Sequence, residues 1–148
     1  MSVWQRARHA WNSSALQPPF ANDPFAIDAH TASPFSAPSP YSGIYDPESV
    51  PPPGRAESPE AEAAQHPLLE YQLGHVEQRK FFRDGAGLGR DMDEAAVRRM
   101  RAAYYGLISE VDEHLGRVIA TLKESGHYGK TLIVFTADHG EQLGDHHL

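Results

Sequence analysis

The chain contains no cysteine among its 148 residues. That absence excludes a disulfide framework and a thiol nucleophile within this sequence. The chain also lacks a run of about 18 apolar residues, the length that a membrane-spanning helix needs. Its N-terminal stretch has no apolar core of about 7–15 residues, which a signal peptide would require. We therefore predict a cytoplasmic protein without a membrane partner.

Basic residues are also scarce. The 13 lysines and arginines are outnumbered by 20 aspartates and glutamates, so the formal net charge is -7. A nucleic-acid-binding protein is expected to carry a basic surface, and we therefore predict no nucleic-acid partner. An anionic small-molecule substrate remains compatible with this charge, because a bound metal ion can invert the local field.

The prolines are unevenly distributed and divide the chain into two parts. All of them lie between Pro18 and Pro67. Residues 1–54 are therefore expected to form an irregular, proline-rich segment, and residues 1–32, which have no sustained apolar period, are expected to be poorly ordered. Residues 55–148 are expected to form a helical region followed by a C-terminal strand.

Local signals place two short helical stretches after residue 55. Ser58 is suited to cap a helix whose first residue is Pro59, because a serine hydroxyl accepts from the free N–H groups of the first turn. Pro67 cannot continue a helix and should kink or restart it.

The clearest helix is predicted over residues 92–125. Its apolar residues recur in steps of three and four, which places them on one face. Asp91 or Asp93 can cap its start, and Gly126 can end it in the left-handed conformation. Aspartates and glutamates within the helix are expected to be solvated.

The most informative stretch is the last one, residues 131–148. Leu132–Thr136 form a short apolar and β-branched run, which suits a strand buried on both faces of a parallel sheet. Asp138 and His139 follow directly, and parallel-sheet enzymes bind ligands just beyond the carboxyl ends of their strands. A carboxylate oxygen beside an imidazole nitrogen suits a divalent cation. The alternative for this pair is a solvated turn at the end of a strand.

The stretch IVFTADHGEQLGDHHL resembles the C-terminal metal motif of the sulfatase family, within the alkaline phosphatase superfamily. It is most similar to the phosphonate monoester hydrolase and phosphodiesterase branch. The resemblance implies an α/β fold, namely part of an alkaline-phosphatase-like parallel-sheet domain in which a long helix precedes a buried strand. A relative with a threonine or serine nucleophile and two metals fits the Gly-Glu-x-Leu-Gly-Asp-His continuation less well.

The resemblance also assigns chemistry to single residues. It implies that Asp138 and His139 are ligands of one divalent cation, which could be Mn, Mg, Ca or Zn, and that the substrate is an anionic ester of sulfate or of phosphate or phosphonate. Asp145 would support the site from outside the ligand shell, and His146 and His147 would be supporting or surface groups.

The sequence departs from the family pattern in two places. The family's nucleophile arises from a cysteine in a Cys-x-Pro-x-Arg motif, and this sequence has no cysteine. Ala32 stands where the family has a substrate-contacting histidine, and His30 is out of register. We therefore expect an incomplete hydrolase chain that is inactive alone and to which no catalytic residue is assigned. The alternative is a non-catalytic metal-binding or subunit-interaction module, and in both cases the chain could form an oligomer.

Overall fold

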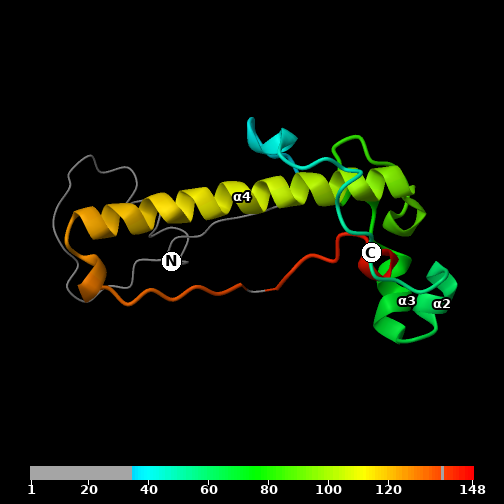
Figure 1. Cartoon of the computed structure of the whole chain (residues 1–148). Coiled ribbons are helices and arrows are strands. Elements are labelled where there is room, and N and C mark those ends of the chain that lie inside the picture. The colour runs from blue at the N-terminus through cyan, green and yellow to red at the C-terminus, as the bar shows by residue number, and fades with distance from the viewer. Residues whose placement is uncertain (1–34, 138) are drawn as a thin grey trace.

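A computed structural model describes residues 35–137 and 139–148 of the chain. One long helix, α4 (Glu94–Glu124), dominates this part, and two short helices, α2 (Pro59–Ala63) and α3 (Pro67–Leu73), lie near its N-terminal end (Figure 1). Short 3-10 turns complete the regular structure: η1 (Tyr41–Gly43), η2 (Gln78–Lys80), η3 (Gly89–Asp91), η4 (Tyr128–Lys130) and η5 (Asp145–His147). The predicted poor order of residues 1–32 lies outside the described residues.

Helix α4 begins and ends as its sequence predicts. The Asp93 carboxylate accepts a hydrogen bond from the Ala96 N–H at 2.6 Å, which satisfies a donor of the first turn. At the other end Gly126 adopts a φ of 72°, and the His127 N–H donates to the Leu122 carbonyl at 3.0 Å. A left-handed residue with this bond forms a Schellman cap, for which glycine is favoured because it has no Cβ. The helix predicted over residues 92–125 is confirmed.

The two short helices also follow their local signals. The Ser58 hydroxyl accepts from the Ala61 N–H at 3.2 Å, and Pro59 is the first residue of α2. A new helix, α3, begins at Pro67. The ring of its N-cap residue, His66, accepts a hydrogen bond from the Leu68 N–H at 3.1 Å. A proline at the first position costs little, because its missing N–H would have no partner within the helix.

The core lies around the first half of α4. Met100 is fully buried and packs with Phe35, Phe81 and other apolar side chains of a single cluster. Tyr104 stands edge-on to Phe35 with ring centroids 5.2 Å apart. The apolar face of the second half of α4 is only partly buried. None of the described helices is long and apolar enough to cross a membrane.

The expected buried strand after α4 is absent from the described residues, and this corrects the parallel-sheet expectation. Residues 131–137 are extended but form no strand, and Leu132, Val134 and Phe135 are 89%, 76% and 78% exposed. A strand needs a neighbour for its backbone N–H and C=O groups, and no other strand exists in the part of the chain that the structure describes. The apolar run therefore lacks the sheet that would bury it.

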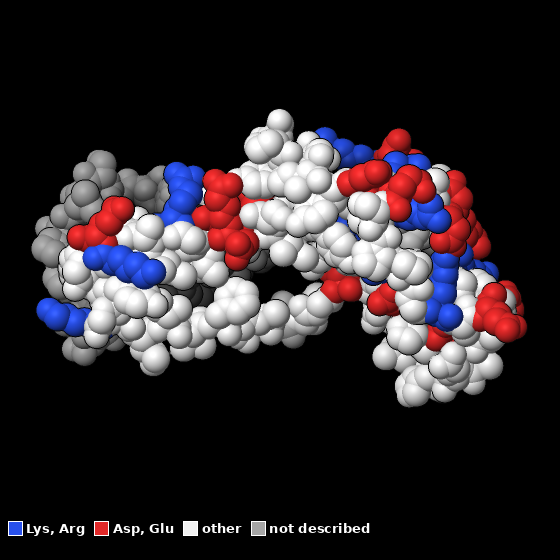
Figure 2. Space-filling view, in the orientation of Figure 1, with Lys and Arg blue, Asp and Glu red and all other residues white. Residues whose placement is uncertain are grey.

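The extended segment leads back from the far end of α4 toward α2 and α3 (Figure 1). In the space-filling view it forms a strip without charged side chains, separated from α4 by an opening (Figure 2). The segment is followed by His139 and then by the C-terminal residues, of which Leu143 and Leu148 are buried.

Candidate functional site

His139 lies at the end of the extended segment and is exposed. Its Nδ1 is 2.9 Å from the Gly140 carbonyl oxygen. Because a carbonyl only accepts, this hydrogen bond requires the proton on Nδ1 and leaves the acceptor lone pair on Nε2. Histidines that ligate metals commonly donate their second ring nitrogen to a carbonyl or carboxylate in this way. Asp138, the other predicted ligand, lies outside the described residues.

The described residues alone do not complete a metal site. Across 35–137 and 139–148, no group of three or more histidine, cysteine, aspartate or glutamate side chains could hold an ion. A catalytic zinc, for comparison, has about three protein ligands. The donor chemistry of His139 fits a divalent cation, but the remaining ligands would have to come from outside these residues.

The residues after His139 return to the core as a docked segment, Leu143–Leu148, which we call the C-terminal clip. Leu143 and Leu148 are both buried, and Leu143 belongs to the core cluster. The clip also packs its η5 turn against α2. His139, the predicted metal ligand, is thus exposed, whereas the clip that begins four residues later at Leu143 is packed against the core.

Arg101 of α4 is the main polar anchor of the clip. Its side chain is buried, and its Nη1 donates to the Leu143 carbonyl at 3.0 Å and to Asp145 Oδ1 at 3.2 Å. The same carboxylate oxygen accepts from the Gly54 N–H at 2.9 Å. The His146 N–H then donates to the Gly54 carbonyl at 3.0 Å. Asp145, which the resemblance places as a supporting residue of the site, joins the clip to α4 and to residue 54.

Glu62 of α2 is the second anchor and is 1% exposed. It accepts from the Ala56 N–H at 2.7 Å and lies 2.7 Å from His146 Nδ1. These two hydrogen bonds, the backbone one first, favour the carboxylate and lower the pKa of Glu62. His147 Nε2 donates to the Ala56 carbonyl at 3.0 Å. Both histidines therefore hold the clip to the α2 side of the molecule.

The contacts of Arg101 and Glu62 are not predicted by the sequence motifs above. Arg101 follows Val97 by four residues and precedes Tyr104 by three, so it lies on the apolar face of the helix. A charge on that face is a detectable signal of a buried pair. Glu62 lies in the first turn of α2, and nothing near it in the sequence indicates a partner 84 residues away.

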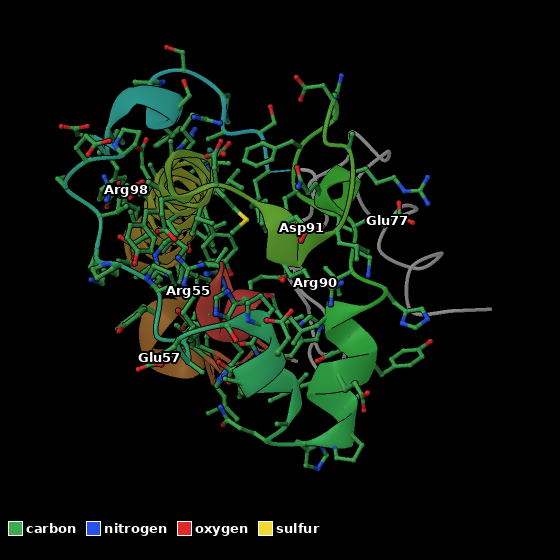
Figure 3. All side chains as sticks on the ribbon, turned by 90° about the vertical axis from the view of Figure 1, so that its right-hand side faces the viewer. Arg55, Glu57, Glu77, Arg90, Asp91 and Arg98 are labelled. Atoms are coloured by element: carbon green, nitrogen blue, oxygen red, sulfur yellow. The ribbon has the colours of Figure 1, made fainter. Side chains whose placement is uncertain are left out.

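A separate open pocket of about 430 Å³ lies between α2 and α3. Arg90 lies beside α3 at this pocket, and Arg55 lies between α4 and α2, where it pairs with Glu94 (Figure 3). No residue of the ligand loop or of the clip lines the pocket; its walls are Pro59, Glu60, Ala63, Ala64, Glu70, Leu73 and Arg90. We therefore place the candidate chemistry at His139, where a metal-binding residue type exists.

Most of the chain is similar in sequence to proteins of one family. The profile of the Sulfatase family matches residues 12–148. The multifunctional alkaline phosphatase superfamily protein PehA of Trinickia caryophylli is 54% identical over 115 residues, which are 78% of this chain and 22% of that protein. An arylsulfatase of Clostridium perfringens is 40% identical over 55 residues, or 37% of this chain and 11% of that protein.

Solved structures agree with the sequence matches. The phosphonate monoester hydrolase of Agrobacterium radiobacter is similar with a TM-score of 0.75 and 38% identity, over 97% of this chain and 27% of that one. The phosphonate monoester hydrolase SpPMH of Silicibacter pomeroyi is similar with a TM-score of 0.68 and 43% identity, over 77% of this chain and 22% of that one. The chain spans about a quarter of these structures. The match over residues 12–148 shows that the chain belongs to the sulfatase family.

Proposed function

We propose that this chain is part of a metal-dependent hydrolase of sulfate or of phosphate or phosphonate esters, in which Asp138 and His139 are ligands of one divalent cation. The observation that carries the proposal is the sequence pair Asp138-His139 within a chain that the Sulfatase family profile matches over residues 12–148, and the bond from His139 Nδ1 to the Gly140 carbonyl is compatible with it. The phosphonate monoester hydrolases among the similar structures support the substrate class.

The proposal assigns limited roles. When bound, a divalent cation neutralises charge on the oxygens of a transferred group. His139 would contribute one nitrogen and Asp138 one carboxylate to hold it. We assign no nucleophile, because the sequence has no cysteine, and we expect the chain alone to give no hydrolysis.

A chimera tests the proposal directly. The similar segment, 77% of this chain, would replace the matching 22% of the Silicibacter pomeroyi phosphonate monoester hydrolase, and kcat/KM would be measured with a phosphonate monoester. We expect the chimera to hydrolyse the ester. His139→Ala should lower kcat/KM by more than about a hundredfold, since even the loss of an outer partner of a metal ligand costs about 10–100-fold.

The matched control is His127→Ala. His127 is also exposed and has its Nδ1 2.9 Å from a backbone carbonyl, that of Ser125, but it does not follow an aspartate. This variant should keep the activity of the chimera. Full activity of a folded His139→Ala chimera would refute the assignment of His139.

A second candidate function is a subunit-interaction module without catalysis. The exposed apolar side chains of Leu132, Val134 and Phe135 favour it, because large exposed apolar patches often mark interaction sites. Sedimentation velocity of the chain separates the two candidates when read beside the chimera. A stable oligomer that Val134→Lys dissociates, together with an inactive but folded chimera, would favour the interaction module.

A further inference from the structure

The extended segment, residues 131–137, has the composition of a strand but no strand beside it. It contains no charged residue, proline or glycine, and Leu132, Val134 and Phe135 are 89%, 76% and 78% exposed. No backbone–backbone hydrogen bond joins residues 132–137 to another residue that the structure describes. An extended apolar strand whose N–H and C=O groups are unpaired is a template on which a second strand can add.

A second molecule can reach this segment from one side. Helix α4 runs along the segment, and no element that the structure describes covers the side away from the helix (Figure 1). In the space-filling view the segment is a strip without charged side chains (Figure 2). A partner strand therefore meets apolar side chains and backbone groups there.

The sequence around Val134 is complementary to itself in antiparallel order. Lys130 lies four residues before Val134 in the sequence, and Asp138 lies four residues after it. Two antiparallel copies centred on Val134 would thus place each of these lysines opposite the aspartate of the other copy, and Ile133 opposite Phe135. Opposite charges, and an aromatic opposite a β-branched residue, are stabilising cross-strand pairs. A parallel, in-register pair would instead place lysine beside lysine.

The two charges also select one register. If the copies shift by one residue, Lys130 faces Ala137 while the apolar positions still face one another. The shift therefore keeps the apolar contacts and loses both ion pairs. A register is weakly specified in a strand that is apolar on both faces, so the charged ends are what distinguishes one pairing from the next.

We propose that residues 130–138 are a self-association site, at which two copies of the chain pair as antiparallel strands about a two-fold axis at Val134. Each copy contributes the same segment, so the pair of Lys130 with Asp138 occurs twice. A ribbon of two strands is only marginally stable in water, so we expect a dimer at high protein concentration and a monomer in dilute solution. The proposal needs no metal, and it gives the second candidate function a defined partner, a second copy.

Disulfide cross-linking tests the register, because the 148-residue chain has no cysteine of its own. Opposite Cα atoms of antiparallel strands lie about 4.5–5.5 Å apart, which a disulfide can bridge. Val134→Cys should therefore give a covalent dimer under mild oxidation. Leu132→Cys alone and Thr136→Cys alone should not, because two copies of either position lie about 13 Å apart along the pair. An equal mixture of these two variants should cross-link, because the two positions face each other.

The control for cross-linking is Leu68→Cys. Leu68 is also a large apolar residue that is 56% exposed, but it lies in α3. This variant should remain uncross-linked on a non-reducing gel under the same oxidation.

Charge exchange is a second test, read by sedimentation velocity in buffer with EDTA. Lys130→Asp should raise the dimer Kd by about tenfold, because it replaces two exposed ion pairs by like charges, and Asp138→Lys should do the same. An equal mixture of these two variants should restore the original Kd, because their heterodimer again places opposite charges together. Lys123→Asp changes the net charge as Lys130→Asp does, but it lies in α4 and should leave the Kd unchanged.

Three results would overturn the self-association site. The chain sediments as a monomer at every concentration, Leu68→Cys cross-links as readily as Val134→Cys, or the mixed charge variants associate no more tightly than either one alone. Each of them leaves the proposed ester hydrolase standing, because the chimera tests that function separately and these measurements are made without metal.

Discussion

Gly106, in the middle of α4, gives the sharpest test of how the proline-rich segment packs. A Cβ built on Gly106 would lie 2.4 Å from the Tyr41 carbonyl oxygen and 3.1 Å from the Tyr41 carbonyl carbon. These are backbone atoms, so the η1 turn would have to move as a unit. Overpacking of this kind costs about 1–3 kcal/mol. Alanine in a helix interior gains about 1 kcal/mol over glycine, which offsets part of that cost.

Gly116→Ala is the matched control, because the same helix places nothing within 4 Å of a Cβ at Gly116. It should stabilise the chain by about 1 kcal/mol. The difference between the two substitutions therefore isolates the clash, and we expect it to be about 1–3 kcal/mol in urea unfolding. If both substitutions stabilise the chain equally, the η1 turn does not pack on Gly106 and this account of the fold fails.

Two titratable side chains and two apolar side chains provide further tests of the fold. Glu62 has a pKa below its ordinary value of 4.5, so its contribution to stability should be present above that pH and lost as the pH falls below it; Glu62→Gln should flatten this acid loss in melting curves. Tyr41 donates to Glu113 at 2.6 Å, which raises its pKa above 10.0; its contribution should be present below pH 10.0 and lost as the pH rises through the raised pKa, and Tyr41→Phe should remove that alkaline loss. Met100→Ala should cost about 2–5 kcal/mol in urea unfolding, because the side chain is fully buried. Val134→Lys should change stability by less than about 0.5 kcal/mol, because the valine is 76% exposed; a larger loss would show that the segment is buried after all.

The helices could be predicted because their signals are local. A capping aspartate or serine, a proline at the first position and a glycine at the end act within a few residues of each other, and Ser58, Pro67, Asp93 and Gly126 fulfil these roles. The family was also recognisable from one contiguous stretch, and the match over residues 12–148 confirms it.

The strand could not be predicted correctly because burial of a strand depends on partners. Residues 132–136 have the composition of a buried strand, but composition does not supply a neighbouring strand, and the described residues contain none. The clip was missed for a related reason. Arg101 and Asp145 are 44 residues apart, and His146 and Glu62 are 84 apart, so only the folded chain brings them together.

The most direct test of the central claim compares two histidines of the unaltered chain during a Mn²⁺ titration. His139 and His127 are both exposed, and each has its Nδ1 2.9 Å from a backbone carbonyl, but only His139 follows an aspartate. If the pair formed by Asp138 and His139 grips a divalent cation, the ring signals of His139 will broaden at lower Mn²⁺ concentrations than those of His127. Equal broadening of the two rings would contradict the account.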